Sequence, residues 1–273
     1  MEAAARPFKP TSERAHSGQD GGFIASLRRT ILSLEGRPAV LEDDPAALSP
    51  FGVPAVDAAL GGGLRRGALH EIAATGEAEI ASATGFTLTL AARAPARAVL
   101  WIAEETATRE SGAPYGLGLD EIGLAPERLV IVTAAHARDV LWAMEEALRC
   151  RAVGAVIGEL RTQRGVGDVA VRRLSLAAAE RGGLALLLRT APSAEATPAD
   201  TRWIVGPAAS APTRHGIGPP AIAVQLIRNR RGVLGSWMLE WNCVDQRFQL
   251  ASTHPQPLAE AVADRPRRAA GAA

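Results

Sequence analysis

Aromatic residues and cysteines are scarce in this sequence. Aromatic side chains make up 4% of its 273 residues, so Ala, Leu, Val and Ile must build most of the core. The two cysteines, Cys150 and Cys243, are far apart and show no CxxC or Cys/His spacing. This spacing argues against a disulfide scaffold and against a structural zinc site.

Net charge, lysine and long apolar runs are also lacking. Lys and Arg number 30 against 29 for Asp and Glu, so only a local patch could draw the chain onto nucleic acid or acidic lipid. Lys9 is the only lysine. No apolar run approaches the ~18 residues of a membrane span, and residues 1–10 lack the apolar core of a secretory signal. The sequence therefore predicts a cytoplasmic protein that does not contact a membrane.

Composition predicts one folded domain between two terminal segments. Apolar residues, at 47%, and charged residues, at 22%, stand near the balance of globular proteins. We assign the domain to residues 51–251. Residues 1–21 and 252–273 lack periodicity and are rich in Ala, Pro and charge, which predicts disorder. Residues 22–50 are expected to hold a helix and a linker that contains several prolines.

Short apolar runs alternate with helical patterns through the middle of the sequence. The runs expected to be strands are Ala68–Ala73, Val99–Ala103, Leu129–Thr133, Val153–Ile157 and Leu184–Leu188. Helices are expected at 137–151, where Val140, Met144 and Leu148 form one apolar stripe, and at 169–181. Strands that are apolar on both faces need cover on both faces. The alternation therefore predicts an α/β fold, a mostly parallel sheet flanked by helices.

The last third of the sequence has a different pattern. Strand-like segments follow one another without helices between them at Thr201–Val205, Ala221–Arg228, Ser236–Trp241 and Arg247–Leu250. The run Asn229–Gly235 has the composition of a hairpin loop. We therefore expect the sheet to end in antiparallel strands.

The segment from Phe51 to Ile72 carries the clearest family signal. A short helix is expected at 54–60, with Pro at its start and the Gly61–Gly63 run at its end, and a strand follows Gly67. This order of elements resembles the opening of RecA-like ATPase cores, in which the strand leads into the phosphate loop. The resemblance implies a RecA-like fold for residues 51–251.

The loop after that strand lacks the residues that bind phosphate. A phosphate loop reads GxxxxGK[ST]: backbone amides cradle the phosphates, the lysine neutralises their charge and the hydroxyl binds magnesium. Counted from Gly76, the second glycine is Ala81, the lysine is Ser82 and the hydroxyl residue is Ala83. We interpret the loop as a structural remnant, and predict a protein without enzymatic activity and without a cofactor.

The loop also carries charge of the wrong sign. Glu77 and Glu79 place negative charge where a triphosphate would sit. An arginine such as Arg93 could supply positive charge, but neither the reach of the lysine nor the hydroxyl that binds magnesium.

Two further positions of an ATPase site agree with this interpretation. Gly158 stands where the acidic magnesium ligand is expected, with Glu159 next to it. Glu104 and Glu105 occupy the place of the water-activating glutamate. Because a catalytic base needs a bound triphosphate to act on, we interpret these two residues as solvated carboxylates at a strand end.

Several segments together carry a narrower resemblance. They are Phe51–Ile72, Leu141–Leu148, Val156–Leu160, Thr201–Trp203, Leu226–Arg230 and Gly235–Trp241. In these segments, which span about residues 22–250 with their surroundings, the chain resembles the bacterial ImuA family. That family is the RecA- and SulA-related member of a damage-inducible mutagenesis cassette.

The resemblance implies a role in translesion DNA synthesis during the SOS response. Together with the phosphate loop that lacks its lysine, it leads to the hypothesis of a non-catalytic protein–protein adaptor. The implied partners are an ImuB-type Y-family-like protein, an error-prone DNA polymerase and RecA. Residues 1–21 and 252–273 are candidate recruitment segments that order on binding. Two alternatives stay open: an active ATPase whose phosphate site is rebuilt around arginine, and a SulA-like inhibitor of cell division.

Two groups of side chains are candidate contacts. Candidate partner contacts are Trp203, Trp237 and Trp241, of which the last two share one strand face with Leu239; a hairpin packed in the core is the alternative interpretation. Candidate DNA contacts in predicted loops are Arg161, Arg164, Arg214, Arg228, Arg230 and Arg231. Solvated surface arginines are the alternative. No aromatic residues interleave with them, so base stacking is not predicted.

Overall fold

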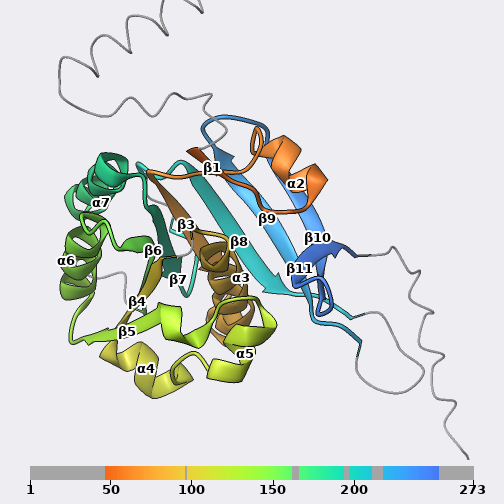
Figure 1. Ribbon diagram of the computed structural model, residues 1–273, viewed down its shortest axis with the longest axis horizontal. Helices are drawn as coiled ribbons and strands as arrows, with labels where there is room; N and C mark the ends of the chain where they lie inside the picture. Colours follow the sequence, from red (N-terminus) through yellow and green to blue (C-terminus); the bar gives the residue numbers. More distant parts are fainter. Residues whose placement is uncertain (1–46, 96, 162–165, 194–196, 211–217, 252–273) are drawn as a thin grey trace, which may run out of the picture. The chain divides into compact units, whose positions relative to one another are not determined.

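The computed structural model describes residues 47–95, 97–161, 166–193, 197–210 and 218–251 (Figure 1). The chain divides into two units, Met1–Ala47 and Leu48–Ala273, and the elements described below belong to the second. The segments predicted to be disordered, 1–21 and 252–273, and the helix predicted within 22–50 lie outside the described residues.

A nine-stranded sheet runs through the second unit in the order β11-β10-β9-β8-β3-β7-β6-β4-β5. Its parallel part consists of β3 (Ala68–Ala74), β4 (Ala98–Glu104), β5 (Leu129–Ala134), β6 (Val153–Leu160), β7 (Leu184–Arg189) and β8 (Thr201–Pro207). Its antiparallel part consists of β9 (Ala221–Asn229), β10 (Gly235–Asn242) and β11 (Arg247–Leu250). The predicted α/β fold with antiparallel C-terminal strands is confirmed, and β8 belongs to the parallel part.

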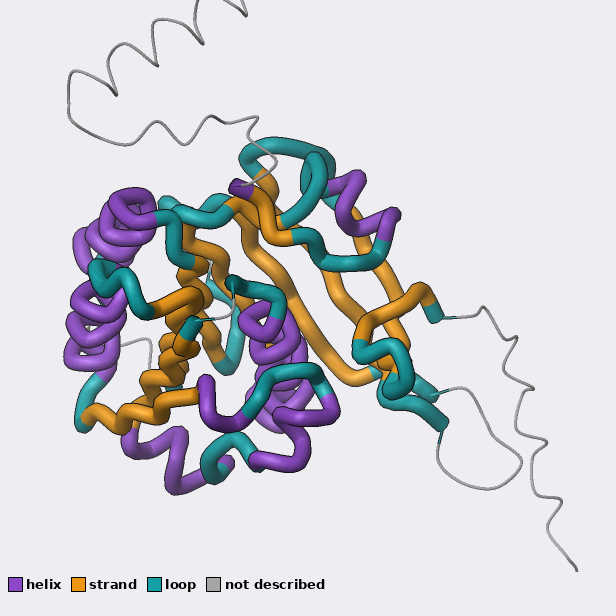
Figure 2. Tube along the Cα trace, viewed as in Figure 1, coloured by secondary structure: helices purple, strands orange, loops and turns teal. Residues whose placement is uncertain are grey.

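Helices cover both faces of the parallel part (Figure 2). α6 (Ala137–Leu148) and α7 (Asp168–Arg181) pack on one face, and α3 (Ile80–Ala92) packs on the other. The shorter elements are α2 (Pro54–Ala59), α4 (Glu105–Ser111), α5 (Gly116–Glu121), the 3-10 turns η2 (Glu77–Glu79) and η3 (Pro126–Arg128), and the two-stranded sheet of β1 (Leu48–Ser49) and β2 (Leu64–Arg65). Within the described ranges, no helix has the length and apolarity that a membrane crossing needs.

The apolar stripe predicted for α6 is confirmed, because Val140, Met144 and Leu148 are all buried against the sheet. The prediction that every apolar strand is covered on both faces is wrong for β5. Val130 and Ile131 are 47% and 42% exposed. β5 pairs with β4 alone at the end of the sheet, and an edge strand has no neighbour to cover its outer side.

Six aromatic residues pack on one another between α3 and the antiparallel strands: Phe51, Phe86, Trp203, Trp237, Trp241 and Phe248. Phe86 on α3 lies 5.6 Å from Trp203 on β8, measured between ring centroids. Phe51 stacks on Phe248 at 5.8 Å, and Phe248 meets the edge of Trp241 at 5.0 Å. These large side chains fill the region where the sheet changes from parallel to antiparallel.

Candidate functional site

The glycine-rich turn before β3 is fixed by its backbone geometry. Gly63 has a φ of +139°, and a Cβ on it would lie 2.6 Å from the carbonyl oxygen of Ser49. Asp57 on α2 accepts hydrogen bonds from the backbone N–H groups of Phe51 (2.6 Å) and Gly52 (2.9 Å). These residues of the family segment therefore shape the chain that leads into β3.

In the loop after β3, the carboxylate of Glu79 lies over the backbone, where a phosphate loop would bind the phosphates of a nucleotide. The Thr75 N–H donates to the Val205 carbonyl at 3.0 Å, which ties the start of the loop to β8. Glu79 then folds back over Gly76, so that a Cβ on Gly76 would lie 2.6 Å from the Glu79 Oε2 atom. A negative group on the loop backbone repels a phosphate rather than attracting it.

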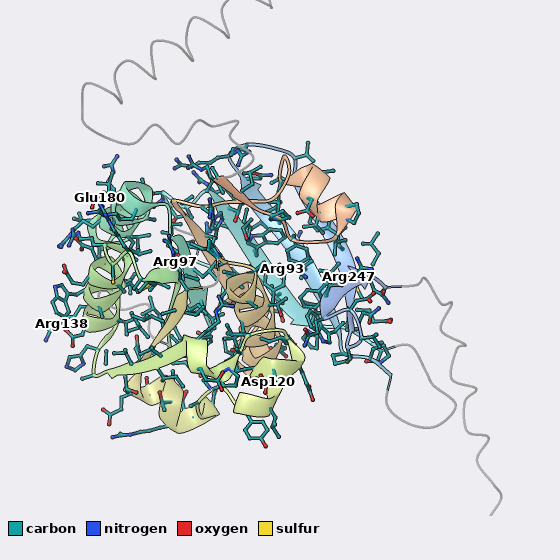
Figure 3. All side chains as sticks on the ribbon, in the orientation of Figure 1. Arg93, Arg97, Asp120, Arg138, Glu180 and Arg247 are labelled. Atoms are coloured by element: carbon teal, nitrogen blue, oxygen red, sulfur yellow. The ribbon has the colours of Figure 1, made fainter. Side chains whose placement is uncertain are left out.

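The other loop positions do not restore a phosphate site. Ala83, at the hydroxyl position, is fully buried in the core, while Ala81 is exposed and Ser82 is half-buried. Arg93 follows the last residue of α3 and lies against Gly52 (Figure 3). The helical rise of 1.5 Å per residue puts it roughly 16 Å from Ser82. Arg93 is therefore too far away to supply the charge of the missing lysine.

An open hollow of about 380 Å³ borders the loop at Thr75. It lies against β8, β9 and β10, and its lining residues are Thr75, Ile204, Ala223, Val224, Gln225, Ser236, Trp237 and Met238. None of these side chains carries a charge, so the hollow offers a triphosphate no cation.

Two buried glutamates lie where the parallel strands end. Glu159, at the end of β6, faces Arg161 at 3.3 Å. Burial raises the pKa of Glu159, and the charge of Arg161 and a hydrogen bond with Trp101 offset part of this rise. Glu104, at the end of β4, is buried and accepts a hydrogen bond from Thr106 Oγ1 at 3.3 Å, so the prediction that it is solvated is wrong. Glu105 is half-buried and pairs with Arg109 one helical turn away. No group of three or more His, Cys, Asp or Glu residues in the described ranges could hold a metal ion.

The arginines near these strand ends are engaged by carboxylates. The Arg161 side chain is 8% exposed and pairs with Glu159 and, at 3.8 Å, with Glu110. The structure thus buries a residue predicted to contact DNA. Arg164 and Arg214 lie outside the described residues. Arg161 lies where the parallel strands end, whereas Arg228, Arg230 and Arg231 lie where they begin. The predicted DNA contacts therefore do not form one surface.

The tryptophans predicted as partner contacts face the core. Trp203 is 1% exposed, Trp241 is also buried, and half-buried Trp237 lies 6.3 Å from Trp203 between ring centroids. Sequence reasoning missed a different tryptophan, Trp142 on α6, which is 63% exposed. Its position off the apolar stripe of α6 was the signal that could have placed it on the surface.

Comparison with known proteins gives a curated relative and a solved fold. Protein ImuA from Caulobacter vibrioides, in strain NA1000 / CB15N and in strain ATCC 19089 / CIP 103742 / CB 15, is 32% identical over 214 residues, which cover 72% of this chain and 84% of the relative. The crystal structure of the RadB recombinase superposes with a TM-score of 0.52 at 14% identity, over 75% of this chain and 100% of that one. This likeness confirms the RecA-like fold. No family model matches the chain.

Proposed function

Since this chain belongs to the ImuA family, we propose that it is a non-catalytic accessory protein of translesion DNA synthesis in SOS mutagenesis. In this proposal it works in the cytoplasm as a protein–protein adaptor. It joins an ImuB-type Y-family-like protein to an error-prone DNA polymerase.

The observation that carries the non-catalytic part is the loop after β3. A triphosphate needs a cation on its β- and γ-phosphates and a hydroxyl for magnesium. Here Ser82 and Ala83 stand at those two positions, and the Glu79 carboxylate lies over Gly76. At the carboxyl ends of β6 and β7, Arg161 pairs with Glu159 and Arg189 pairs with Glu71. This arrangement supports a RecA-like scaffold that no longer binds ATP.

An exposed apolar surface on α6 and α7 supports the adaptor part. Glu145 on α6 pairs with Arg173 on α7 at 2.7 Å and so joins the two helices. Trp142 precedes Glu145 by three residues, while Val169 and Leu176 lie on either side of Arg173 at helical spacing. Val169 is 74% exposed and Leu176 is 50% exposed. Figure 3 shows the outer side of these helices at Arg138 and Glu180.

We predict that Trp142→Ala weakens capture of the ImuB-type partner by roughly thirtyfold, because tryptophan is among the side chains most often found at interface hot spots. The measurement is affinity capture from damage-treated cells, followed by titration of the purified partner. Tyr115→Ala is the matched control, since Tyr115 is 71% exposed on another part of the domain. Capture of neither polymerase-type protein by the unaltered chain contradicts the adaptor role; equal capture by both variants contradicts only the assignment of this surface.

A further inference from the structure

Five arginines lie where the parallel strands begin, at the end of the sheet opposite to the loop after β3. Arg65 and Arg66 precede β3, so they lie where the parallel strands begin. β9 runs antiparallel to β8, with Asn229 opposite Thr201, so the turn between β9 and β10 reaches the same edge. The amino-edge cluster consists of Arg65, Arg66, Arg228, Arg230 and Arg231.

Asp200 connects the two turns that carry this cluster. Its carboxylate pairs with Arg65 at 3.1 Å, and its carbonyl accepts a hydrogen bond from the Arg230 N–H at 3.0 Å. The Asp200 carboxylate is buried, so it does not face an approaching anion. His70 is buried beside Arg65, and burial lowers its pKa. His70 is therefore neutral at neutral pH and adds no charge.

The β9–β10 turn is held in place before any ligand binds. Asn229 Nδ2 donates to the carbonyl oxygens of Ala59 (2.8 Å) and Val233 (3.2 Å), and Asn229 Oδ1 accepts from the Arg231 N–H at 3.1 Å. Gly232 packs on the Ala59 carbonyl with no room for a side chain. Figure 1 shows this turn beside α2. A turn that is already ordered binds at a lower entropic cost.

No carboxylate in the described part of the chain neutralises the arginines at the end of β9 and in this turn. Arg228, Arg230 and Arg231 form no ion pair with any residue that the structure describes. The Arg228 Nε atom is buried and has no hydrogen-bond partner in the described part of the chain. The Arg231 guanidinium lies over Gly61, with Nη2 3.6 Å from the place of a Cβ. These guanidinium groups differ in this respect from Arg161, which is held by carboxylates at the other edge.

We propose that the amino-edge cluster binds the phosphodiester backbone of DNA without reading its sequence. The planar fork of arginine matches phosphate oxygens, and cations spread over two turns match a polymer of single negative charges better than one compact anion. No aromatic side chain is part of the cluster, so binding uses phosphates rather than stacked bases. Duplex DNA, which has the higher charge density, is bound at least as tightly as a single strand of the same sequence.

The test uses the full chain and fluorescein-labelled DNA, with anisotropy measured over a series of salt concentrations. The double variant Arg230→Gln/Arg231→Gln is expected to bind roughly tenfold or more weakly for any sequence. The slope of log K against log salt should fall in magnitude by about 2, because two phosphate contacts are lost. Circular dichroism verifies that the variant is folded, and Arg230→Gln alone, at an exposed position, is the fallback.

Arg172→Gln/Arg181→Gln is the matched control, because it removes the same charge from exposed positions on α7. Equal weakening by this control, or no DNA binding by the unaltered chain at low salt, overturns the proposal. If the cluster binds an acidic protein segment instead, the exposed Val233 and Leu234 at the tip of the turn would lie within that contact. Loss of partner capture in Val233→Ser/Leu234→Ser, together with no DNA binding by the unaltered chain, therefore assigns the cluster to protein and also overturns the proposal. The adaptor role is tested separately, since partner capture through Trp142 should survive in Arg230→Gln/Arg231→Gln.

Discussion

Replacing Trp203 with alanine is expected to lower the free energy of unfolding by about 3–5 kcal/mol. The side chain is buried, and its ring lies 5.6 Å from Phe86 and 6.4 Å from Phe51 between centroids. Its Nε1–H donates to Thr201 Oγ1 at 2.8 Å. Alanine leaves a cavity in the region where β8 meets the antiparallel strands, and it also removes the donor to a buried hydroxyl.

The measurement is urea unfolding followed by circular dichroism. Trp142→Ala provides the control, because that exposed side chain is expected to change stability by no more than about 0.5 kcal/mol. The two tryptophans then separate core packing from partner binding. Similar losses in both variants, or a stable Trp203→Ala protein that fails to capture the partner, would contradict the core assignment of Trp203.

Replacing Glu71 with alanine is expected to cost about 3–5 kcal/mol as well, because it removes one partner from a buried charge cluster. Glu71 on β3 pairs with Arg202 at 3.1 Å and with Arg189 at 3.8 Å, and accepts a hydrogen bond from Thr197 Oγ1 at 2.7 Å. The side chains of all three charged residues are largely buried. The variant leaves two positive charges in the protein interior with less compensation.

The same urea titration measures this loss. Glu105→Ala is the control, because its ion pair with Arg109 is solvent-exposed and should be worth less than about 1 kcal/mol. Glu71→Gln keeps the shape and the acceptor oxygen, so an intermediate loss is expected. If Glu71→Ala costs no more than Glu105→Ala, the buried cluster does not stabilise the sheet.

The features predicted correctly from the sequence are those that depend on local patterns. The strand pattern of β3, the continuous apolar runs of β6 and β7 and the stripe on α6 each follow from the period of one element and its burial. The residues at the lysine and hydroxyl positions of a phosphate loop, Ser82 and Ala83, are a property of the sequence alone. The loss of nucleotide binding that they predict stays a prediction.

The features that were missed depend on which elements are neighbours. Nothing in the β5 sequence says that it ends the sheet. The core-packed hairpin was one of two interpretations of the β10 tryptophans, and the choice between them depends on Trp203 and Phe248, which pack against Trp237 and Trp241. The arginines were grouped because they lie in predicted loops. The loop after the parallel strand β6 lies at the carboxyl ends of the parallel strands, whereas the turn after the antiparallel strand β9 lies at their amino ends. Burial of Glu104 likewise depends on side chains that are distant in the sequence.

Isothermal titration of the full chain with Mg-ATP measures whether this RecA-like scaffold still binds a triphosphate. Because Glu79 lies over Gly76 and Ser82 replaces the lysine, we expect no heat of binding beyond dilution. Saturable binding at micromolar affinity would contradict it, and would favour an ATPase whose site is rebuilt around arginine.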